Sequence, residues 1–110
     1  MIINFKEMDL KVIPNFNGGE KEFRANMYID DNNKIVNGRL IPGASVGWHC
    51  HDTSSETILI LSGSGKVIVE GGEEPVSAGT VHYCPKGAFH SLVNTGEEDL
   101  CFFAVVPQHK

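Results

Sequence analysis

The chain has 110 residues, 41% of them hydrophobic, and a formal net charge of −5. This length and composition predict one globular domain over residues 1–110 and argue against a disordered or multidomain chain. No basic cluster stands out and no apolar run approaches the roughly 20 residues of a membrane span, so we expect neither nucleic acid nor a membrane as partner. The N-terminus lacks the pattern of a secretory signal, and we expect a cytoplasmic location.

Short apolar segments broken by turn residues follow one another along the chain. In chain order, the predicted strands are 23–29, 35–41, 46–51, 56–61, 66–70, 75–77, 80–84, 89–94 and 100–106. Paired glycines such as Gly71-Gly72 are typical of the turns between them. No window shows a helical period, which leaves room for one short N-terminal helix only. Strands at this spacing predict an all-β sandwich or barrel.

The last predicted strand, 100–106, is apolar without alternation, as in a strand that is covered on both faces. One face would meet the barrel interior. The other would meet either an N-terminal segment or a second subunit. A chain of this length has little to spare for covering an outer face, so we expect a homodimer.

The three cysteines, Cys50, Cys84 and Cys101, match no disulfide framework or zinc knuckle. We therefore expect reduced, mostly buried thiols. A second interpretation is that Cys50 or Cys84 touches a metal site. Alternation along a strand turns Cys50, together with Trp48, away from the face of its histidine neighbours, which argues against Cys50 as a ligand.

Metal-ligating side chains gather in two segments that glycines delimit. His49 and His51 share one face of a predicted strand, with Cβ atoms about 7 Å apart. Glu56 begins the next strand, and His90 follows a turn later in the chain. Three imidazoles and a carboxylate suit one divalent ion such as Mn, Fe, Ni, Co, Cu or Zn. Such a donor set leaves one or two coordination positions for water or a ligand.

These two segments resemble the two sequence motifs of the cupin superfamily. The first runs from Gly43 to Gly63: glycine, five residues, His-x-His, four residues, glutamate, six residues, glycine. The second runs from Gly79 to Asn94: glycine, five residues, Pro-x-Gly, two residues, histidine, three residues, asparagine. The resemblance, to small single-domain cupins, implies a double-stranded β-helix, or jelly-roll barrel, and agrees with a homodimer. It also implies which residues are the metal ligands: His49, His51, Glu56 and His90.

Other polar side chains are candidates for the pocket. His82 is predicted either to line it as an acid/base or substrate contact, or to be a hydrogen-bonded or solvent-facing histidine. Many cupins have an aliphatic residue at the corresponding position, so His82 is a departure from the family. Arg39 either binds a substrate carboxylate in a bidentate fork or is solvated. Asn94 is predicted to satisfy backbone groups at a strand end.

Two functions from different classes fit this sequence. One is a metalloenzyme acting on a small polar metabolite, such as a sugar acid, keto acid or dicarboxylate, by isomerisation, a lyase step, decarboxylation or dioxygenation. The alternative is a non-catalytic module that binds or senses a small molecule through its metal. The chain has no appended DNA-binding helix, so we do not expect a transcription regulator.

Overall fold

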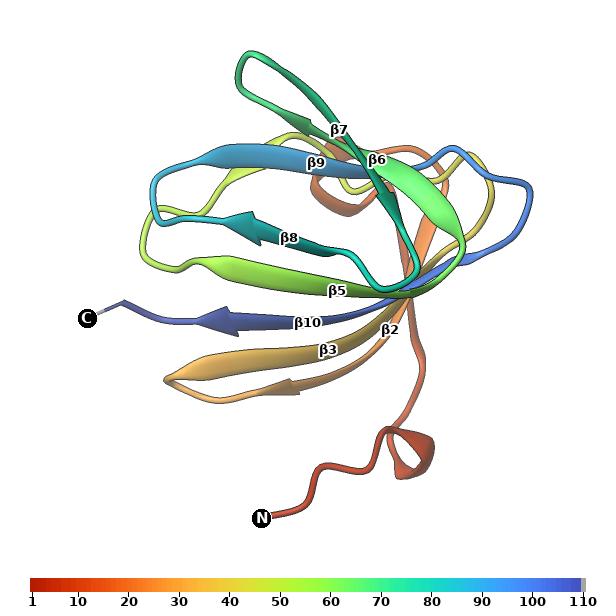
Figure 1. Ribbon diagram of the computed structural model, residues 1–110. Helices are drawn as coiled ribbons and strands as arrows, with labels where there is room; N and C mark the ends of the chain where they lie inside the picture. The colour runs from red at the N-terminus through yellow and green to blue at the C-terminus, as the bar shows by residue number, and fades with distance from the viewer. Residues whose placement is uncertain (110) are drawn as a thin grey trace.

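Two antiparallel sheets face each other in the computed structural model, which describes residues 1–109 (Figure 1). One sheet has the strand order β1-β2-β3-β10-β5-β8 and the other has the order β4-β9-β6-β7. This jelly-roll arrangement confirms the predicted all-β double-stranded β-helix. The strands are Lys11–Pro14 (β1), Glu22–Ile29 (β2), Asn33–Leu40 (β3), His49–Cys50 (β4), Glu56–Ser62 (β5), Ser64–Val69 (β6), Gly72–Ser77 (β7), Val81–Cys84 (β8), Phe89–Asn94 (β9) and Leu100–Pro107 (β10).

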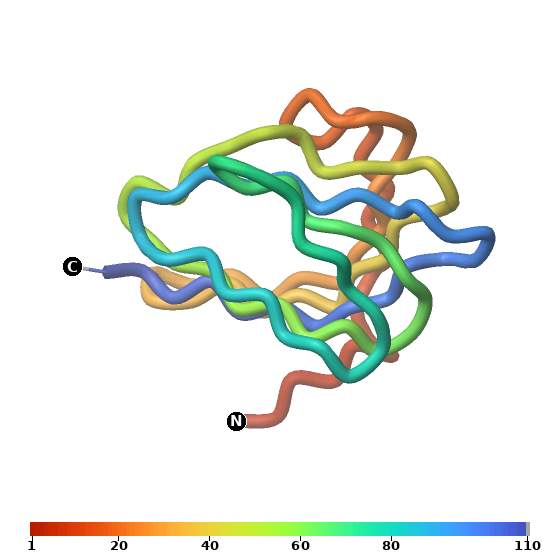
Figure 2. Tube along the Cα trace, turned by 45° about the horizontal axis from the view of Figure 1, so that its top comes forward, coloured from red at the N-terminus to blue at the C-terminus, as the bar shows by residue number. Residues whose placement is uncertain are grey.

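The hydrophobic core lies between the two sheets, which form the walls of a barrel (Figure 2). Alternation along the strands sends every second side chain inward. Burying a large aliphatic or aromatic side chain there contributes about 1.5–3 kcal/mol. Fully or almost fully buried core residues from both sheets include Leu40, Ile58, Ile60, Val67, Leu92, Leu100 and Phe102.

Strand β10 lies inside the larger sheet, between β3 and β5. Its inward side chains are buried and its outward ones are half-buried. On the outer face, Phe103 meets Phe5 of the N-terminal 3-10 turn Phe5–Glu7, with ring centroids 6.3 Å apart. The N-terminal segment, one of the two alternatives predicted from the sequence, thus covers part of the outer face of β10. The homodimer stays a prediction.

The predicted strand 46–51 is wrong in extent, because only His49–Cys50 forms a strand, although the N–H of Val46 also bonds to the Leu92 carbonyl of β9 at 2.9 Å. The cause is the loop around the 3-10 turn Phe16–Gly18, which packs on the preceding residues. The backbone N–H of Gly47 donates to the carbonyl of Phe16 at 2.9 Å instead of to a strand. A Cβ atom at Gly47 would collide with the Asn17 carbonyl, so this close approach requires glycine.

The N-terminal stretch also contains a strand that the sequence did not predict. Strand β1 pairs with β2 at the edge of the larger sheet and is mostly exposed. It has four residues and ends at Pro14, too short for an alternating pattern to emerge. The only helical pieces within residues 1–109 are the two 3-10 turns, and neither is long enough to cross a membrane.

Candidate metal centre

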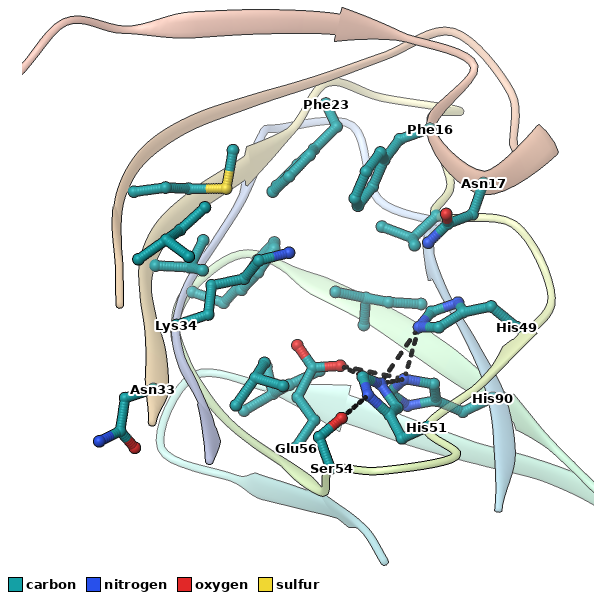
Figure 3. A pocket seen from close by; sticks show the side chains of 18 of the residues that line it. Phe16, Asn17, Phe23, Asn33, Lys34, His49, His51, Ser54, Glu56 and His90 are labelled. Atoms are coloured by element: carbon teal, nitrogen blue, oxygen red, sulfur yellow. Dashed lines mark hydrogen bonds and ion pairs between the residues drawn. The ribbon is translucent and has the colours of Figure 1, made fainter. Parts of the chain in front are cut away.

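The four predicted metal ligands meet on the wall of a cavity between the sheets (Figure 3). His49 lies in β4 and pairs in register with His90 of β9. His51 directly follows β4, and Glu56 is the first residue of β5. The four donor atoms all lie within 4.8 Å of one another. The fold therefore joins the two sequence motifs into one cluster that is able to hold a metal ion.

The spacing of the donor atoms fits a single ion. The Nε2 atoms are 3.3 Å apart for His49 and His51, 3.0 Å for His51 and His90, and 3.1 Å for His49 and His90. Glu56 Oε1 lies 3.1 Å from His51 Nε2 and 3.0 Å from His90 Nε2. Metal–ligand bonds of about 2.1 Å place neighbouring ligands of an octahedral ion about 3.0 Å apart. Lone pairs packed this closely repel one another unless a cation or a proton lies between them.

Hydrogen bonds at the other ring nitrogen orient two of the imidazoles. His49 Nδ1 donates to the carbonyl oxygen of Gly47 at 2.7 Å. A carbonyl only accepts, so the proton resides on Nδ1 and the Nε2 lone pair faces the cluster. His51 Nδ1 lies 3.0 Å from the hydroxyl oxygen of Ser54, which is able to accept in the same way.

Residues after β10 fix the loop that carries Ser54. The hydroxyl of Thr53 donates to the side-chain oxygen of Gln108 at 3.1 Å, and the backbone N–H of His109 donates to the Thr53 carbonyl at 2.7 Å. His109 Nε2 also lies 2.8 Å from the hydroxyl of Ser55. These contacts hold Ser54 beside His51, a supporting role that the sequence analysis missed.

Two groups of the cluster, Glu56 and His49, have the protonation state that metal binding requires. Burial alone would raise the pKa of Glu56, but the close contacts of its carboxylate with the His51 and His90 imidazoles bring it down to about 2. Burial lowers the pKa of His49 below its ordinary value, and the neighbouring imidazoles lower it further. At neutral pH, Glu56 is therefore an ionised carboxylate and His49 a neutral imidazole.

The cavity beside the cluster has a volume of about 480 Å³ and is lined mainly by apolar side chains from both sheets. Among the described residues, one cation enters it: Lys34 reaches inward from β3, with its Nζ 5.9 Å from the ring centroid of Phe16 (Figure 3). Within residues 1–109, Lys34 makes no ion pair. Lys34 was not among the residues predicted to line the pocket, although its two-residue spacing from the buried Val36 signals an inward position.

The two predicted pocket candidates outside the motif ligand set do not line this cavity. Arg39 is on the outer face of β3, half exposed, with its Nε 3.7 Å from Asp99 Oδ2. His82 is buried behind His90: its Nε2 lies 3.0 Å from His90 Nδ1, and its Nδ1 lies 3.1 Å from Glu74 Oε1. Of the alternatives for His82, the structure shows the hydrogen-bonded histidine.

All three cysteines are free thiols. Cys50 borders the cavity, but its thiol donates to Asp52 Oδ1 at 3.2 Å and is not part of the donor cluster. Cys84 is buried next to His82 and His90, and burial raises its pKa to about 11, which keeps the thiol protonated at neutral pH. Of the three predicted buried thiols, Cys84 is buried, whereas Cys50 and Cys101 are half-buried.

Asn94 at the end of β9 satisfies backbone groups, as predicted. Its side-chain amide donates to the carbonyls of Leu40 and Glu98 at 2.9 and 2.8 Å, and its oxygen accepts the N–H of Gly96 at 2.9 Å. The side chain is fully buried. It joins the end of β9 to β3 and to the following turn, away from the cavity.

Comparisons with known proteins place the chain in a family. The model of the cupin domain (Cupin_2) matches residues 38–106. The "Oxalate-binding protein" of Thermotoga maritima is 34% identical, over 96% of this chain and 93% of its own length. A crystal structure from Thermotoga maritima, described as a predicted oxalate decarboxylase, has a TM-score of 0.91 at 32% identity and covers 98% of this chain and 99% of its own. The polyketide cyclase RemF of Streptomyces resistomycificus shares the fold, with a TM-score of 0.79 at 23% identity over 97% of this chain and 78% of its own. The chain belongs to the cupin family.

Proposed function

We propose that this cupin binds one divalent transition metal ion and uses it to capture a small carboxylate anion. The observation that carries the proposal is the donor cluster, whose four atoms are spaced for one ion and lie on the wall of a cavity. Imidazole and carboxylate donors suit Mn, Fe, Ni, Co, Cu or Zn. When bound, such an ion supplies a Lewis-acid site for a ligand oxygen. The ligands are His49, His51, Glu56 and His90.

The charge of the cavity supports an anion as the ligand. Lys34 brings an ammonium group into an otherwise mainly apolar space, and it has no carboxylate partner among the described residues. An anion held by the ion would satisfy this charge at a low local dielectric, where the attraction is stronger than in water. The name of the Thermotoga maritima relative, an oxalate-binding protein, supports a small dicarboxylate.

Capture without turnover is the function that the lining of the cavity favours. Neither His82 nor Arg39 faces it. Apart from the metal donors and Lys34, the titratable side chains within residues 1–109 that line it are Asp30 and Cys50. Asp30 Oδ1 accepts two backbone N–H groups of its own turn, and the Cys50 thiol is bonded to Asp52. A decarboxylase or another enzyme needs a group free to move a proton to the ligand.

The test begins with metal content, measured by mass spectrometry on protein purified without added metal. Isothermal titration of the metal-loaded protein with oxalate, malonate, succinate and acetate then reports affinity against ligand length and charge. We expect stoichiometric binding of a short dicarboxylate and weaker binding of acetate. Because oxalate itself chelates metals, gel filtration followed by a second metal measurement controls for stripping of the ion.

Product formation separates capture from catalysis. The same metal-loaded protein is incubated aerobically with each ligand, and the mixture is followed by NMR. Unchanged ligand supports capture, whereas formate or carbon dioxide from oxalate would establish an enzyme instead. Failure of the protein to retain any divalent metal at one ion per chain would refute the proposed function.

A further inference from the structure

A chain of hydrogen bonds leads from the back of His90 to the surface on the side away from the cavity. His90 Nδ1 lies 3.0 Å from His82 Nε2, and His82 Nδ1 lies 3.1 Å from Glu74 Oε1. His90 and His82 are buried, whereas the side chain of Glu74 is 56% exposed in a groove of about 500 Å³. His90, His82 and Glu74 come from β9, β8 and β7. These hydrogen bonds therefore connect an edge strand of the larger sheet with the smaller sheet.

The carboxylate at the surface end fixes the direction of these hydrogen bonds. An ionised carboxylate only accepts, so His82 must donate from Nδ1. A neutral imidazole has one ring proton, and the hydrogen bond to Glu74 places that proton of His82 on Nδ1. Its Nε2 is then an acceptor, and His90 must donate from Nδ1. The remaining lone pair of His90, on Nε2, faces Glu56 and the other two imidazoles.

A second carboxylate competes for the same proton. Glu56 Oε1 lies 3.0 Å from His90 Nε2, close enough to accept a proton from that atom. A His90 ring protonated at Nε2 has no lone pair to give to a metal ion. The two carboxylates thus act on His90 from opposite sides, Glu56 directly and Glu74 through His82.

We propose that His82, anchored by Glu74, is a positioning residue that holds the His90 proton on Nδ1 and leaves Nε2 available as a metal ligand. The inference rests on the proposed metal site. Outer hydrogen-bond partners of metal-bound histidines usually contribute 10–100-fold to metal affinity, and a carboxylate, carbonyl or water commonly has this role. Here a second buried imidazole, His82, links His90 by hydrogen bonds to a carboxylate that lies outside the core.

The first experiment reads the proton directly and needs no metal. Long-range ¹H–¹⁵N spectra of the imidazole rings are recorded on the metal-free protein at about pH 8, where free imidazole is neutral. In the unaltered chain we expect the proton of His90 on Nδ1. His82→Leu, which fills the same space without an acceptor, should shift it to Nε2, whereas His82→Gln, whose side-chain oxygen can accept, should keep it on Nδ1. A His90 tautomer that is the same in the unaltered chain and in His82→Leu would overturn the proposal.

The second experiment measures Zn²⁺ affinity by competition with a chromophoric chelator. We expect His82→Leu to weaken binding by at least about tenfold and His82→Gln to restore most of it. Glu74→Gln should have a smaller effect in the same direction. Glu73→Gln is the matched control, because Glu73 is the neighbouring residue on β7 and pairs with Lys66 at 2.6 Å instead. An affinity of His82→Leu within twofold of the unaltered chain would contradict the proposal.

Stoichiometry separates this inference from two others. Two Zn²⁺ ions per chain, falling to one in His82→Leu, would make His82 a ligand of a separate ion together with its neighbour Cys84, and would overturn the positioning role. A chain that binds no Zn²⁺ or other divalent ion would refute the proposed function, while the tautomer measurement would still decide the role of His82. A purely structural role predicts lower stability of His82→Leu with an unchanged His90 tautomer.

Discussion

The two walls of the cavity hold their polar side chains in different ways. On the wall formed by the two motifs, the Nδ1 atom of each metal-ligand imidazole has a hydrogen-bond partner. The Glu56 carboxylate contacts the imidazoles of His51 and His90. On the opposite wall, Lys34 of β3 lies over the ring of Phe16 and makes no ion pair within residues 1–109. Groups held by hydrogen bonds suit an ion, whose ligand geometry is demanding, and an ammonium on a flexible four-carbon stem suits anions of more than one length. The comparison predicts that changes on the first wall affect the ion, and changes on the second affect the ligand.

The largest effect is expected from the donors themselves. His90→Ala and His49→Ala should each lower metal affinity by more than about 100-fold, beyond the usual effect of an outer hydrogen-bond partner. Chelator competition measures the loss. Cys50→Ser is the matched control, because Cys50 lies between two ligands and its thiol points to Asp52. Stoichiometric metal in both alanine variants after thorough dialysis would show that the site is misassigned.

A change at Asn94 should show that this motif residue supports the fold and does not bind the metal. Asn94→Ala leaves one buried carbonyl, one part-buried carbonyl and an N–H group without their partner, and we expect a loss of about 2–4 kcal/mol in the free energy of unfolding. Urea denaturation measures this loss, and metal affinity should stay within about twofold. Asn26→Ala, at a half-buried position, should cost less. A larger change in metal affinity than in stability would contradict the framework role.

Lys34→Met should affect the second wall alone. It removes the cation and keeps the length of the side chain, so we expect carboxylate affinity to fall about tenfold, or about 1.4 kcal/mol, with metal affinity unchanged. Titration of the metal-loaded variant measures both. Arg39→Met is the matched control, from the outer face of the same strand. Equal losses in the two variants would indicate a general charge effect instead of a contact in the cavity.

The smallest effect concerns acid stability of the metal-free protein. Burial lowers the folded-state pKa of His49 and His82 below the unfolded value of about 6.5. As pH falls, the unfolded chain therefore takes up protons first, so this contribution to stability is complete above about pH 6.5 and is lost as pH falls toward the folded-state pKa. The urea midpoint should decrease between about pH 7.5 and pH 5.5. His82→Leu should flatten that dependence, and an equally steep decrease in the variant would assign it to other groups.

The sequence predicted the fold and the donor cluster for a physical reason. Strand alternation and turn glycines are local signals, and the motif spacing that relates the chain to cupins places the four donors without knowledge of the rest. The same local rule, applied one residue earlier on β3, would have put Lys34 inside. The strand was instead predicted to begin at Ile35, with Arg39 as the pocket candidate, and the side chain of Arg39 points outward.

Other parts of the site depend on contacts between distant segments, which no local pattern reveals. The shortening of β4 results from the loop at Phe16–Gly18, which takes the hydrogen bond of Gly47. Ser54 is held by residues after β10, and Glu74 reaches His82 from another sheet. His82 was predicted as a departure from the family, with a pocket role among its alternatives. Only its three-dimensional position shows that it lies behind His90 instead of in the pocket.

Strand β4 has only two residues, yet His49 within it and His51 directly after it supply two of the four donors. A strand this short has little backbone pairing to resist local unfolding. An ion bound to both sheets would tie this segment to β5 and β9 and would raise the free energy of opening by mass action. We therefore expect amide hydrogen exchange around β4 to slow on metal loading more than exchange in β3 or β10. The rigidity of the barrel mouth would then increase with the fraction of the protein that has metal bound.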